Sequence, residues 1–588
     1  MLNPHTDRLD YGDKLRAPEG FTLSHGVATT YSLDLETLLC LPLALSFDST
    51  LEGDLQSEKL ALLEAISQLK GKVRVFFQQG EIKLPSAFNL LFSLLEPFLV
   101  PRMPDSAFSS FHPKIWLLRF INAEKNVRYR LLVLSRNLTF DRSWDLAVAL
   151  EGEVSGTASS ENEGLLALLQ ELAPYAKDFA PAFTLFKKEL PTVTWQKPPG
   201  FSGLRTLLGR PGQVPLDLTE TADTVLVISP FLHVEALDML MQQGQQRWLF
   251  SRAEELERLG EKRLEGWDCY ALNSRLVSGE DELTHARAQN LHAKLVLLQR
   301  GAYSHWHIGS ANATKAALGS THQSPRNTEF MVRLSSASTM QSAQQLINEL
   351  VGTETEPTRF FIPYVFGSLL WQAPTTTDQA LRRLQHALIT ADWRMRVTAN
   401  ANNLYTCAID CPPQLLVFAA QVQVQPLVNG HTKALDPQLV WENCSLTEIS
   451  AFLIVRVTLS PEVQSTLLIK VRLDVEGGDH REQKITSSVI DSPHKLLAYI
   501  QMLLQPGHDR TEWPGSNGGG HESAEAVLSH LLGGPIHEAL LQCAARQPQK
   551  LQRIDAVLGH LREVENLIPP ELDMLWVQYQ KLIGKKKP

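Results

Sequence analysis

The hydrophobic and polar positions in the first part of the chain follow two periods. Apolar residues recur at helical spacing over 51–69 and again over 234–242, whereas short, mainly apolar segments occupy 72–77 and 224–230. Helical spacing predicts amphipathic helices, and short apolar runs predict buried strands. Strands that alternate with helices favour a parallel sheet with helices packed against it. The pattern therefore predicts an α/β fold for this part of the chain.

The same order of elements occurs twice. A predicted strand, helix and strand within 25–77 recur within 224–250, and each set is followed by an apolar strand headed by a His-x-Lys motif. A second apolar strand then leads into a Ser-x-Asn motif in each copy. Two copies in the same order indicate an internal duplication rather than a solenoid, which needs more repeats. We therefore predict two similar halves, residues 1–195 and 196–371.

The two motifs carry groups that suit a phosphate. An imidazole can attack phosphorus or donate a proton, an ammonium group holds negative charge, and a hydroxyl and an amide orient oxygens. Adjacent strands would bring the four side chains of each copy together. A single histidine beside a strand often has only a structural role, but two copies of the whole set favour catalysis. The motif residues are His112, Lys114, Ser135 and Asn137 in the first copy and His292, Lys294, Ser310 and Asn312 in the second.

These paired motifs resemble the signature of the phospholipase D superfamily, in which His-x-Lys and Gly-Ser-x-Asn occur twice per active site. The usual Asp five residues after the Lys is replaced by Arg119 in the first copy and by Gln299 in the second, and the first copy also lacks the Gly. A missing Asp is typical of the tyrosyl-DNA phosphodiesterase branch, and SANATKAALG at 310–319 is similar to the second motif of that branch. The resemblance covers residues 25–355. It implies a duplicated phospholipase D-like core with a pseudo-twofold active site.

The resemblance also implies the roles of the motif residues. One histidine attacks phosphorus and forms a phosphohistidine, while the other protonates the leaving oxygen and then activates water. Because histidine titrates near neutral pH, one ring can start neutral and the other charged. We take His112 as the nucleophile and His292 as the general acid. The two lysines and the two asparagines would hold the non-bridging oxygens, so that neither a metal nor a cofactor is required.

Each histidine needs a partner that fixes its tautomer. Glu329, at the start of a predicted strand, is the candidate in the second half, and Asp145 is its counterpart in the first. Surface or capping carboxylates are the alternative for both. His305 and His307 alternate on a predicted strand and are weaker candidates, as are the two serines. The candidate catalytic residues are His112, Lys114, Asn137, Asp145, His292, Lys294, Ser310, Asn312 and Glu329.

The pattern changes after a boundary at 372–378, QAPTTTD. Residues 422–425 and 469–476 alternate between apolar and polar, which predicts strands with one face exposed to solvent. We therefore predict a β-sandwich-like, β-rich domain over 379–504. A flexible linker at 505–521, which contains GSNGGG, should follow. The remaining residues, 522–588, should form a helical region, because apolar residues recur there at helical spacing.

The composition and charge of the chain limit which classes of function are compatible with it. The chain has 588 residues and a net charge of −9, so its surface as a whole does not attract nucleic acid. Residues 112–142 are locally basic and would suit a polyanion held at one site, with a solvated strand pair as the alternative. The six cysteines are scattered, and Cys407 and Cys411 lack the second pair that a zinc site needs. They are typical of free thiols in a reducing compartment.

No part of the sequence indicates a membrane protein or a motor. The N-terminal residues lack the apolar core of a signal peptide, and the run 38–45 is too short to cross a bilayer. We therefore expect a soluble cytoplasmic protein with no membrane element. There is no GxxxxGK[ST] motif, so an ATP-driven motor that works with this protein would be a separate partner protein.

These observations favour a metal-independent phosphodiesterase that cleaves nucleic acid, with DNA as the expected partner. By analogy at the level of the fold, the size and multidomain layout are typical of a DNA endonuclease of a bacterial restriction or anti-phage system. Two alternatives stay open. A lipid phosphodiesterase or transphosphatidylase would need an interfacial apolar helix or loop, and none stands out. A non-catalytic scaffold that binds nucleic acid through a degenerate site would fit the irregular first copy.

Overall fold

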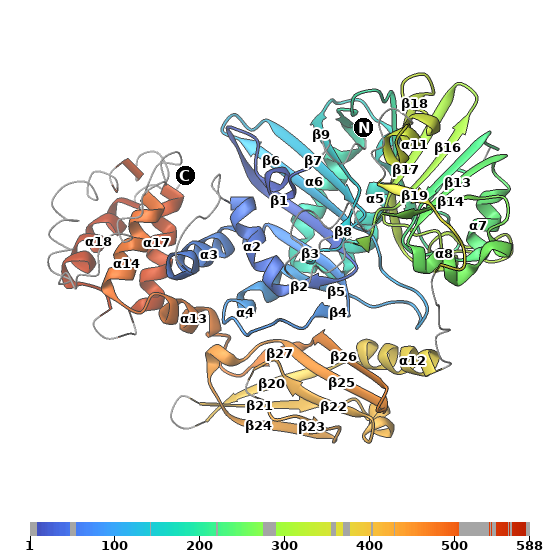
Figure 1. Cartoon of the computed structure of the whole chain (residues 1–588). Helices are drawn as coiled ribbons and strands as arrows, with labels where there is room; N and C mark the ends of the chain where they lie inside the picture. The colour runs from blue at the N-terminus through green and yellow to red at the C-terminus, as the bar shows by residue number, and fades with distance from the viewer. Residues whose placement is uncertain are drawn as a thin grey trace, which may run out of the picture.

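The computed structural model describes most of the chain. It covers residues 9–46, 55–140, 143–218, 221–273, 290–353, 360–368, 377–400, 404–428, 430–504, 540, 542–543, 548–562, 564 and 567–583. The predicted linker at 505–521 and the beginning of the predicted helical region lie outside these residues. Two sheets with their helices lie side by side, strands of a β-rich part lie below them, and a group of helices lies at the side of the first sheet (Figure 1). The mixed α/β fold with several sheets is thus as predicted.

The first sheet has seven strands in the order β10-β9-β7-β6-β1-β3-β5. At one side of the sheet β1 pairs in parallel with β3 and β3 with β5, whereas β6, β7, β9 and β10 continue the sheet antiparallel. The strands are β1 (Phe21–Thr30), β3 (Val73–Gln78), β5 (Leu99–Arg102), β6 (Ile115–Asn122), β7 (Val127–Leu134), β9 (Ala147–Val154) and β10 (Val193–Trp195).

Helices cover both faces of this sheet because side chains of a strand alternate between its faces. Ala28 and Val75 pack with α2 (Leu35–Ser46) and α3 (Leu55–Leu69). Val27 and Phe76 point the other way and pack with α5 (Glu163–Leu172) and α6 (Ala180–Glu189). Short helices α1 (Tyr11–Leu15) and α4 (Phe92–Leu95) complete this part of the chain. The helix predicted at 51–69 and the strand predicted at 72–77 are confirmed within a few residues.

The second sheet has eight strands in the order β11-β18-β17-β16-β12-β13-β14-β19 and repeats the pairing of the first. Its strand β12 is parallel to β13 and antiparallel to β16, as β1 is to β3 and β6. The strands are β11 (Gly203–Gly209), β12 (Thr224–Ile228), β13 (Gln246–Ser251), β14 (Asp268–Leu272), β16 (Leu295–Arg300), β17 (Tyr303–Gly309), β18 (Glu329–Ala337) and β19 (Phe361–Pro363). The helices are α7 (Val234–Met241), α8 (Ala253–Leu259), α10 (Lys315–Leu318) and α11 (Ala343–Val351).

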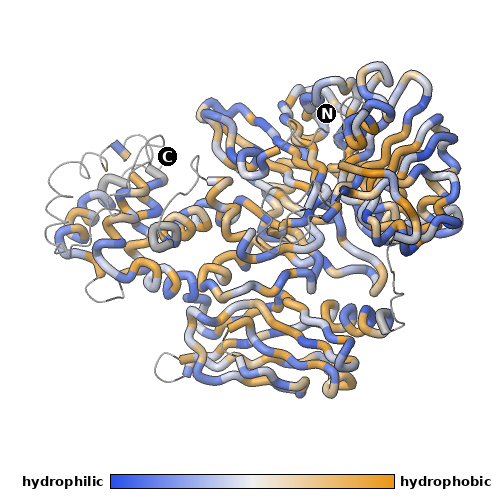
Figure 2. The backbone as a smooth tube through the Cα atoms, viewed as in Figure 1, coloured by the Kyte–Doolittle hydropathy of each residue, from blue (hydrophilic) through white to orange (hydrophobic). Residues whose placement is uncertain are grey.

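The two sheets share one hydrophobic core. Ile115 and Leu117 of β6 lie in the same buried cluster as Leu295 and Leu297 of β16, together with side chains of α5, α6 and α11. Hydrophobic residues gather along these strands, whereas the outer turns are more hydrophilic (Figure 2). The corresponding strands of the two sheets therefore approach each other across this core.

Two further sheets enclose a separate core of apolar side chains. One has the order β24-β21-β20-β27 and the other the order β2-β4-β26-β25-β22-β23, so that β2 and β4 of the first part extend it. The helix α12 (Thr377–Thr390) packs against this core. The strands are β2 (Leu33–Asp34), β4 (Gly80–Lys83), β20 (Arg394–Ala399), β21 (Tyr405–Asp410), β22 (Val422–Pro426), β23 (Lys433–Ala434), β24 (Gln438–Cys444), β25 (Phe452–Ser460), β26 (Val463–Lys470) and β27 (Arg472–Val475).

The interpretation of 469–476 as one strand is wrong. The chain leaves one sheet at Lys470 and enters the other at Arg472. Strands that pass from one sheet to another form the corners of packed sheets. The alternation of apolar and polar residues continues through this corner, because each piece still has one buried and one exposed face, and so the sequence pattern does not reveal the break.

The C-terminal helices pack against the first part of the chain. They are α13 (Arg481–Val489), α14 (Pro493–Leu504), α17 (Pro548–Leu561) and α18 (Pro570–Ile583). Leu551 and Ile554 share a core with Leu60 and Leu63 of α3. Glu64 of α3, which is fully buried, accepts hydrogen bonds from Tyr499 Oη at 2.5 Å and Arg553 Nη1 at 2.7 Å.

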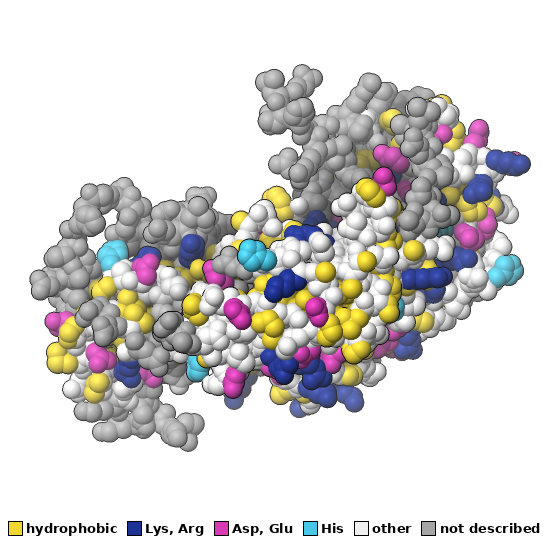
Figure 3. All heavy atoms as spheres, turned by 90° about the horizontal axis from the view of Figure 1, so that it is seen from below, with side chains coloured by type: hydrophobic (Ala, Val, Ile, Leu, Met, Phe, Trp, Pro, Cys, Tyr) yellow, Lys and Arg dark blue, Asp and Glu magenta, His cyan; other side chains and the backbone are white. Residues whose placement is uncertain are grey.

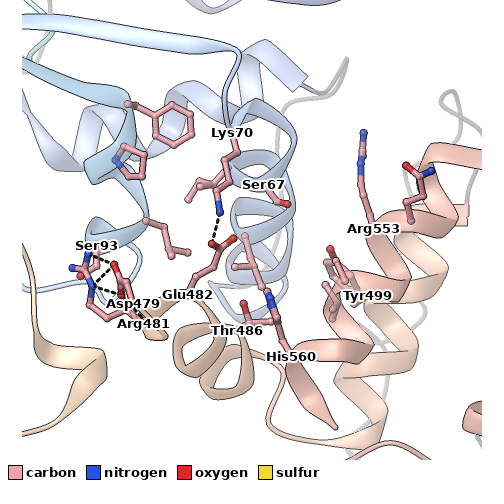
Figure 4. A pocket seen from close by; sticks show the side chains of 18 residues that line it. Ser67, Lys70, Ser93, Asp479, Arg481, Glu482, Thr486, Tyr499, Arg553 and His560 are labelled. Atoms are coloured by element: carbon pink, nitrogen blue, oxygen red, sulfur yellow. Dashed lines mark hydrogen bonds and ion pairs between the residues drawn. The ribbon is translucent and has the colours of Figure 1, made fainter. Parts of the chain in front are cut away.

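A cavity of about 360 Å³ lies between these helices, α3 and the segment 93–98 (Figure 4). Its apolar wall includes Leu63, Ile66 and Phe98. Each charged side chain that lines it has an ion-pair partner among the described residues, as in Lys70–Glu482 at 2.5 Å. The cavity therefore offers no unmatched charge to a phosphate, and the motif histidines do not line it.

Candidate active site

The motif residues of the two halves meet where short backbone bridges join the halves. Phe111 forms a parallel bridge with Thr328, and the strand β8 (Ser143–Trp144) pairs in parallel with β15 (Asn290–Leu291). The backbone N–H of His112 donates to the Thr328 carbonyl, and that of His292 donates to the Trp144 carbonyl, each at 2.9 Å. In both bridges a histidine follows on one strand and an acid on the other.

The two acids serve the histidines of the opposite halves. Nδ1 of His112 lies 2.9 Å from Oε2 of Glu329, and Nδ1 of His292 lies 3.4 Å from Oδ1 of Asp145. The expectation that each acid belongs to the histidine of its own half is wrong. The reason is the pair of bridges, which set each His-x-Lys segment beside the acid-bearing segment of the other half. Each histidine is therefore oriented only when both halves are present.

The two serines hold the acids. Ser310 Oγ donates to Glu329 Oε2 at 2.5 Å and accepts from the Phe330 backbone N–H at 2.9 Å. Ser135 makes the same two contacts in the other half, with Asp145 Oδ1 at 3.4 Å and the Leu146 N–H at 2.8 Å. Both serines are fully buried. The structure therefore places them as positioning residues for the acids rather than as groups that face a substrate.

The two lysines lie deep in the site. Lys114 Nζ donates to the His112 carbonyl at 3.1 Å, and Lys294 Nζ donates to the His292 carbonyl at 2.7 Å and to the Ser135 carbonyl at 3.1 Å. The exposed fractions of Lys114 and Lys294 are 1% and 0%. Burial holds the pKa of Lys114 well below its ordinary value, and the charge of Lys294 lowers it further. Two such ammonium groups favour an anion beside them.

Both histidines are neutral in the free site near pH 7. Burial lowers the pKa of His112 to about 4 in spite of Glu329, and burial together with Lys294 lowers the pKa of His292 to about 4. Burial opposes ionisation of Glu329, but His112 and Lys114 outweigh it, so that the pKa of this carboxyl falls below its ordinary value. Before a substrate binds, the expectation that one of the two histidine rings is neutral and the other charged is therefore not met. A bound anion would raise the pKa values of both His112 and His292.

These shifts predict that stability falls in acid. A histidine with a folded pKa of about 4 and an ordinary value of 6.5 binds its proton more tightly in the unfolded chain. The free energy of unfolding is therefore highest above pH 6.5 and decreases as the pH falls toward 4, by about 3 kcal/mol per ring. Urea unfolding from pH 7 to 4 should show a shallower decrease for His112→Asn than for the wild type. The exposed His322→Asn is the control, and an unchanged slope in His112→Asn would contradict the assignment.

The two asparagines keep an unused hydrogen-bonding capacity. The Oδ1 atoms of Asn137 and Asn312 are buried and have no partner among the described residues. Leaving such an atom unpaired costs about 1–3 kcal/mol. Because an amide can turn over to present its NH₂ group, either side chain could donate to a phosphate oxygen. The loops that carry them are fixed by parallel bridges, Leu33 with Leu138 and Leu232 with Ala313.

The close approach of β18 explains why the second motif contains a glycine, Gly309. A Cβ at this position would lie 2.3 Å from the Phe330 carbonyl oxygen, so no other residue fits without moving β18. The first copy has Leu134 at the corresponding place, where β7 pairs regularly with β9. The missing glycine of the first copy is thus accommodated by a different strand contact.

Arg119 and Gln299, which occupy the position of the superfamily Asp, have structural roles. Arg119 donates from Nε and Nη2 to the two oxygens of Glu189, each at 2.8 Å, and Gln299 Oε1 accepts from the Ala343 N–H at 3.1 Å. His305 Nδ1 lies 2.8 Å from Ser335 Oγ, and His307 Nδ1 lies 3.1 Å from the Val296 carbonyl. Both of these contacts are to residues outside the two motifs.

Sequence reasoning missed three residues that shape the site. The Tyr31 ring lies 5.2 Å from the His112 ring, and Gln78 Oε1 accepts from the Phe111 N–H at 2.7 Å. Arg252 donates to the Leu291 carbonyl from Nε at 3.0 Å and from Nη2 at 2.7 Å. All three lie at or just after the ends of β1, β3 and β13. The carboxyl ends of parallel strands are where α/β sheets bind ligands, and this position is the signal that could have found them.

The basic stretch at 112–142 does not form an open cleft among the described residues. Four of its arginines pair with acids, at 2.8 Å for Arg119–Glu189 and 2.5 Å for Arg130–Glu151. Arg128 and Arg136 pair at longer distances. Arg119 and Arg130 are buried and Arg128 is exposed, so the alternative of a strand pair with surface arginines describes only part of the stretch. On the face drawn in Figure 3, Lys and Arg side chains are likewise interspersed with Asp and Glu.

No three His, Cys, Asp or Glu side chains of the described part of the chain are gathered so that they could hold a metal ion. None of the helices within the described ranges has the length and hydrophobicity that crossing a bilayer requires.

Comparisons with known proteins found similarity among solved structures only. No family model and no curated protein matches the chain. It is similar to yeast tyrosyl-DNA phosphodiesterase, at 13% identity and a TM-score of 0.37 over 57% of this chain and 87% of that chain. Two histidine mutants of the yeast enzyme are similar at TM-scores of 0.36 and 0.35, with 14% and 13% identity, over 57% and 55% of this chain and 86% and 84% of theirs. These solved structures are of the branch of the phospholipase D superfamily that the paired motifs resemble.

Proposed function

We propose that this protein is a phosphodiesterase that cleaves nucleic acid, with DNA as the substrate, through a phosphohistidine and without a metal ion. The observation that carries the proposal is the pseudo-twofold set of histidines and acids. Each histidine bonds through Nδ1 to an acid of the opposite half, and a buried serine holds that acid. Two such sets with two buried lysines form one site.

The first step forms a bond from histidine to phosphorus. Nδ1–H of His112 donates to Glu329, which leaves the Nε2 lone pair free to attack the phosphorus. The bond from phosphorus to the leaving oxygen breaks, and His292, charged by the bound anion, gives that oxygen its proton. In the second step neutral His292 takes a proton from water, and the hydroxide displaces His112 from phosphorus. Atoms and charge balance over the two steps, and the products are an alcohol and a phosphomonoester.

The remaining residues hold the phosphoryl oxygens. Lys114 and Lys294 neutralise negative charge in a site that is largely closed to water, where such charges interact more strongly. With their amides turned so that the NH₂ group takes the place of the unpartnered Oδ1, Asn137 and Asn312 donate to the same oxygens. The catalytic set proposed from the sequence thus divides into groups that touch the phosphate and groups that act through another residue, namely the acids and Ser310.

We also propose a division of the chain into domains. We take 1–195 and 196–371 as duplicated phospholipase D-like halves, which the matching strand order and the matching serine–acid contacts support. Residues 379–504 are taken as the β-sandwich-like domain and 522–588 as the helical region. The packing of α13 and α14 with α3 and α17 supports a helical region that begins before 522.

The biological setting is also a proposal. The preference for nucleic acid over lipid is supported by the similarity of 310–319 to the tyrosyl-DNA phosphodiesterase motif. A cytoplasmic DNA endonuclease of a bacterial restriction or anti-phage system fits the multidomain layout. Any ATP-driven step would be supplied by a separate partner protein, because the sequence has no phosphate-binding GxxxxGK[ST] loop.

Metal independence is the first test of this function. Cleavage of a labelled oligodeoxynucleotide should continue unchanged in excess chelator, because two lysines take the place of a cation. The measurement is the initial rate with and without EDTA, on single- and double-stranded DNA, RNA and phosphatidylcholine. The His112→Ala variant, purified in the same way, controls for contaminating nucleases. Activity that vanishes in EDTA and returns with magnesium would contradict the mechanism, and cleavage of phosphatidylcholine alone would favour the lipid alternative.

A further inference from the structure

We propose that Phe231 and Arg252 form a shelf on which an unpaired nucleobase stacks beside the scissile phosphate, so that the substrate is single-stranded or locally unpaired. This inference rests on the proposed function and specifies its substrate. Three observations support it: the positions of the Phe231 and Arg252 side chains, the contacts that fix them, and the difference between the two halves at this position.

The backbone around Phe231 is fixed, yet its ring is 42% exposed. Ser229 Oγ donates to the Phe231 carbonyl at 2.7 Å and accepts from the Ala313 N–H at 2.9 Å. Leu232 forms a bridge with Ala313 and donates its N–H to Glu255 at 2.9 Å. The ring therefore stands on a rigid segment directly beside the loop that carries Asn312.

Arg252 joins this ring to the segment of the catalytic histidine. Its guanidinium lies 4.6 Å from the centroid of the Phe231 ring. The same guanidinium holds the carbonyl of Leu291, the residue before His292, with two hydrogen bonds. Phe231 thus lies between the segments that present Asn312 and His292.

The other half has the same backbone contacts but no exposed ring at this place. Thr30 Oγ donates to the Ser32 carbonyl at 2.7 Å and accepts from the Leu138 N–H at 3.0 Å, as Ser229 does in the second half. Ser32 therefore stands where the second half has Phe231. The neighbouring Tyr31 turns its ring toward His112, at 5.2 Å, instead of outward. The site is symmetric in its catalytic groups and asymmetric at its rim.

The Arg252 guanidinium lies over one face of the Phe231 ring, and the exposed part of the ring is suited to stacking with a nucleobase. Stacking on an aromatic ring is available to every base, and an arginine adds a cation–π contribution. A base within a duplex already stacks on both neighbours, so its face is not free. Because the shelf adjoins His292, which protonates the leaving oxygen, it would hold the nucleotide that leaves.

The test compares a normal single-stranded oligothymidylate with a chain of the same length made of abasic tetrahydrofuran phosphodiesters. Stacking of about 1–3 kcal/mol corresponds to a loss of about 5- to 150-fold in kcat/KM when the ring is removed. Phe231→Ala should show this loss on oligothymidylate, mainly through KM, and no loss on the abasic chain. Phe231→Trp should keep the wild-type preference, and Tyr303→Ala, which removes another exposed ring, should behave as the wild type.

The outcomes separate the shelf from the underlying chemistry. Equal rates of Phe231→Ala and wild type on both chains would overturn the shelf and leave the phosphodiesterase intact. Faster cleavage of a thymidylate–adenylate duplex than of the single strand by the wild type would also overturn it. If the wild type cleaves neither chain, the proposed function fails and the shelf fails with it. A loss on both chains in Phe231→Ala would show a general defect of the site and contradict a role confined to the base.

Discussion

Replacing either His112 or His292 by alanine is expected to abolish turnover, by about 10³-fold or more, and the double replacement is expected to be no worse. The two rings act on one phosphorus, one as the nucleophile and one as the acid, so removing either stops the cycle and the effects do not add. The structure supports a shared site, because the acid that orients each ring comes from the other half. The measurement is the rate on a labelled oligodeoxynucleotide with each single variant and the double variant.

His305→Ala is the matched control for these variants. Its Nδ1 contacts Ser335, a residue of the neighbouring strand outside the two motifs. It should therefore retain cleavage close to the wild type, while unfolding curves show whether all variants are folded. A near-wild-type rate in either His112→Ala or His292→Ala would show that the two halves do not share one active site.

The second large effect separates the roles of the two histidines. A nitrophenyl diester has a leaving oxygen that is stable as an anion and needs little protonation. His292→Ala should therefore still release nitrophenol in a first burst on this substrate, equal to about one per active site, and then stop, because water is no longer activated. His112→Ala should give no burst on any substrate. Stopped-flow absorbance measures the burst, and a burst in His112→Ala with none in His292→Ala would reverse the roles.

The sequence identified the side chains that gather at the candidate site, but it did not predict their contacts with one another. His112, Lys114 and Asn137 could be found because each stands at a fixed offset from an apolar strand, and the same offsets recur at His292, Lys294 and Asn312. The number of residues between a motif position and its strand determines whether that residue lies at the end of the strand. Glu329 followed from its position at the mouth of a predicted strand, and Asp145 followed as its counterpart in the first half.

The partners of the acids could not be predicted, because they depend on contacts between distant parts of the chain. His112 and Glu329 are 217 positions apart and meet only through the bridge between Phe111 and Thr328. Tyr31, Gln78 and Arg252 were missed for a related reason. Each is an ordinary residue at a strand end, and its importance appears only when the order of the strands in the sheet is known.

Burial also determines the charge states of the two motif histidines. The sequence places two histidines beside lysines and acids, which leaves open whether one ring is charged. In the folded chain the His112 and His292 side chains are only 12% and 21% exposed, and the loss of hydration outweighs the nearby carboxylates. Arg119 of the basic stretch shows the same limit, since its acidic partner, Glu189, lies 70 positions away in the sequence.

The central claim is that a histidine of the first half becomes covalently bonded to phosphorus. The most direct measurement is to incubate His292→Ala with the nitrophenyl diester, quench in base, digest, and map the acid-labile phosphoryl group by mass spectrometry. We predict one adduct per chain, on the peptide that contains His112. An adduct on a histidine outside the motifs, or none under conditions where the burst is seen, would contradict the proposed mechanism.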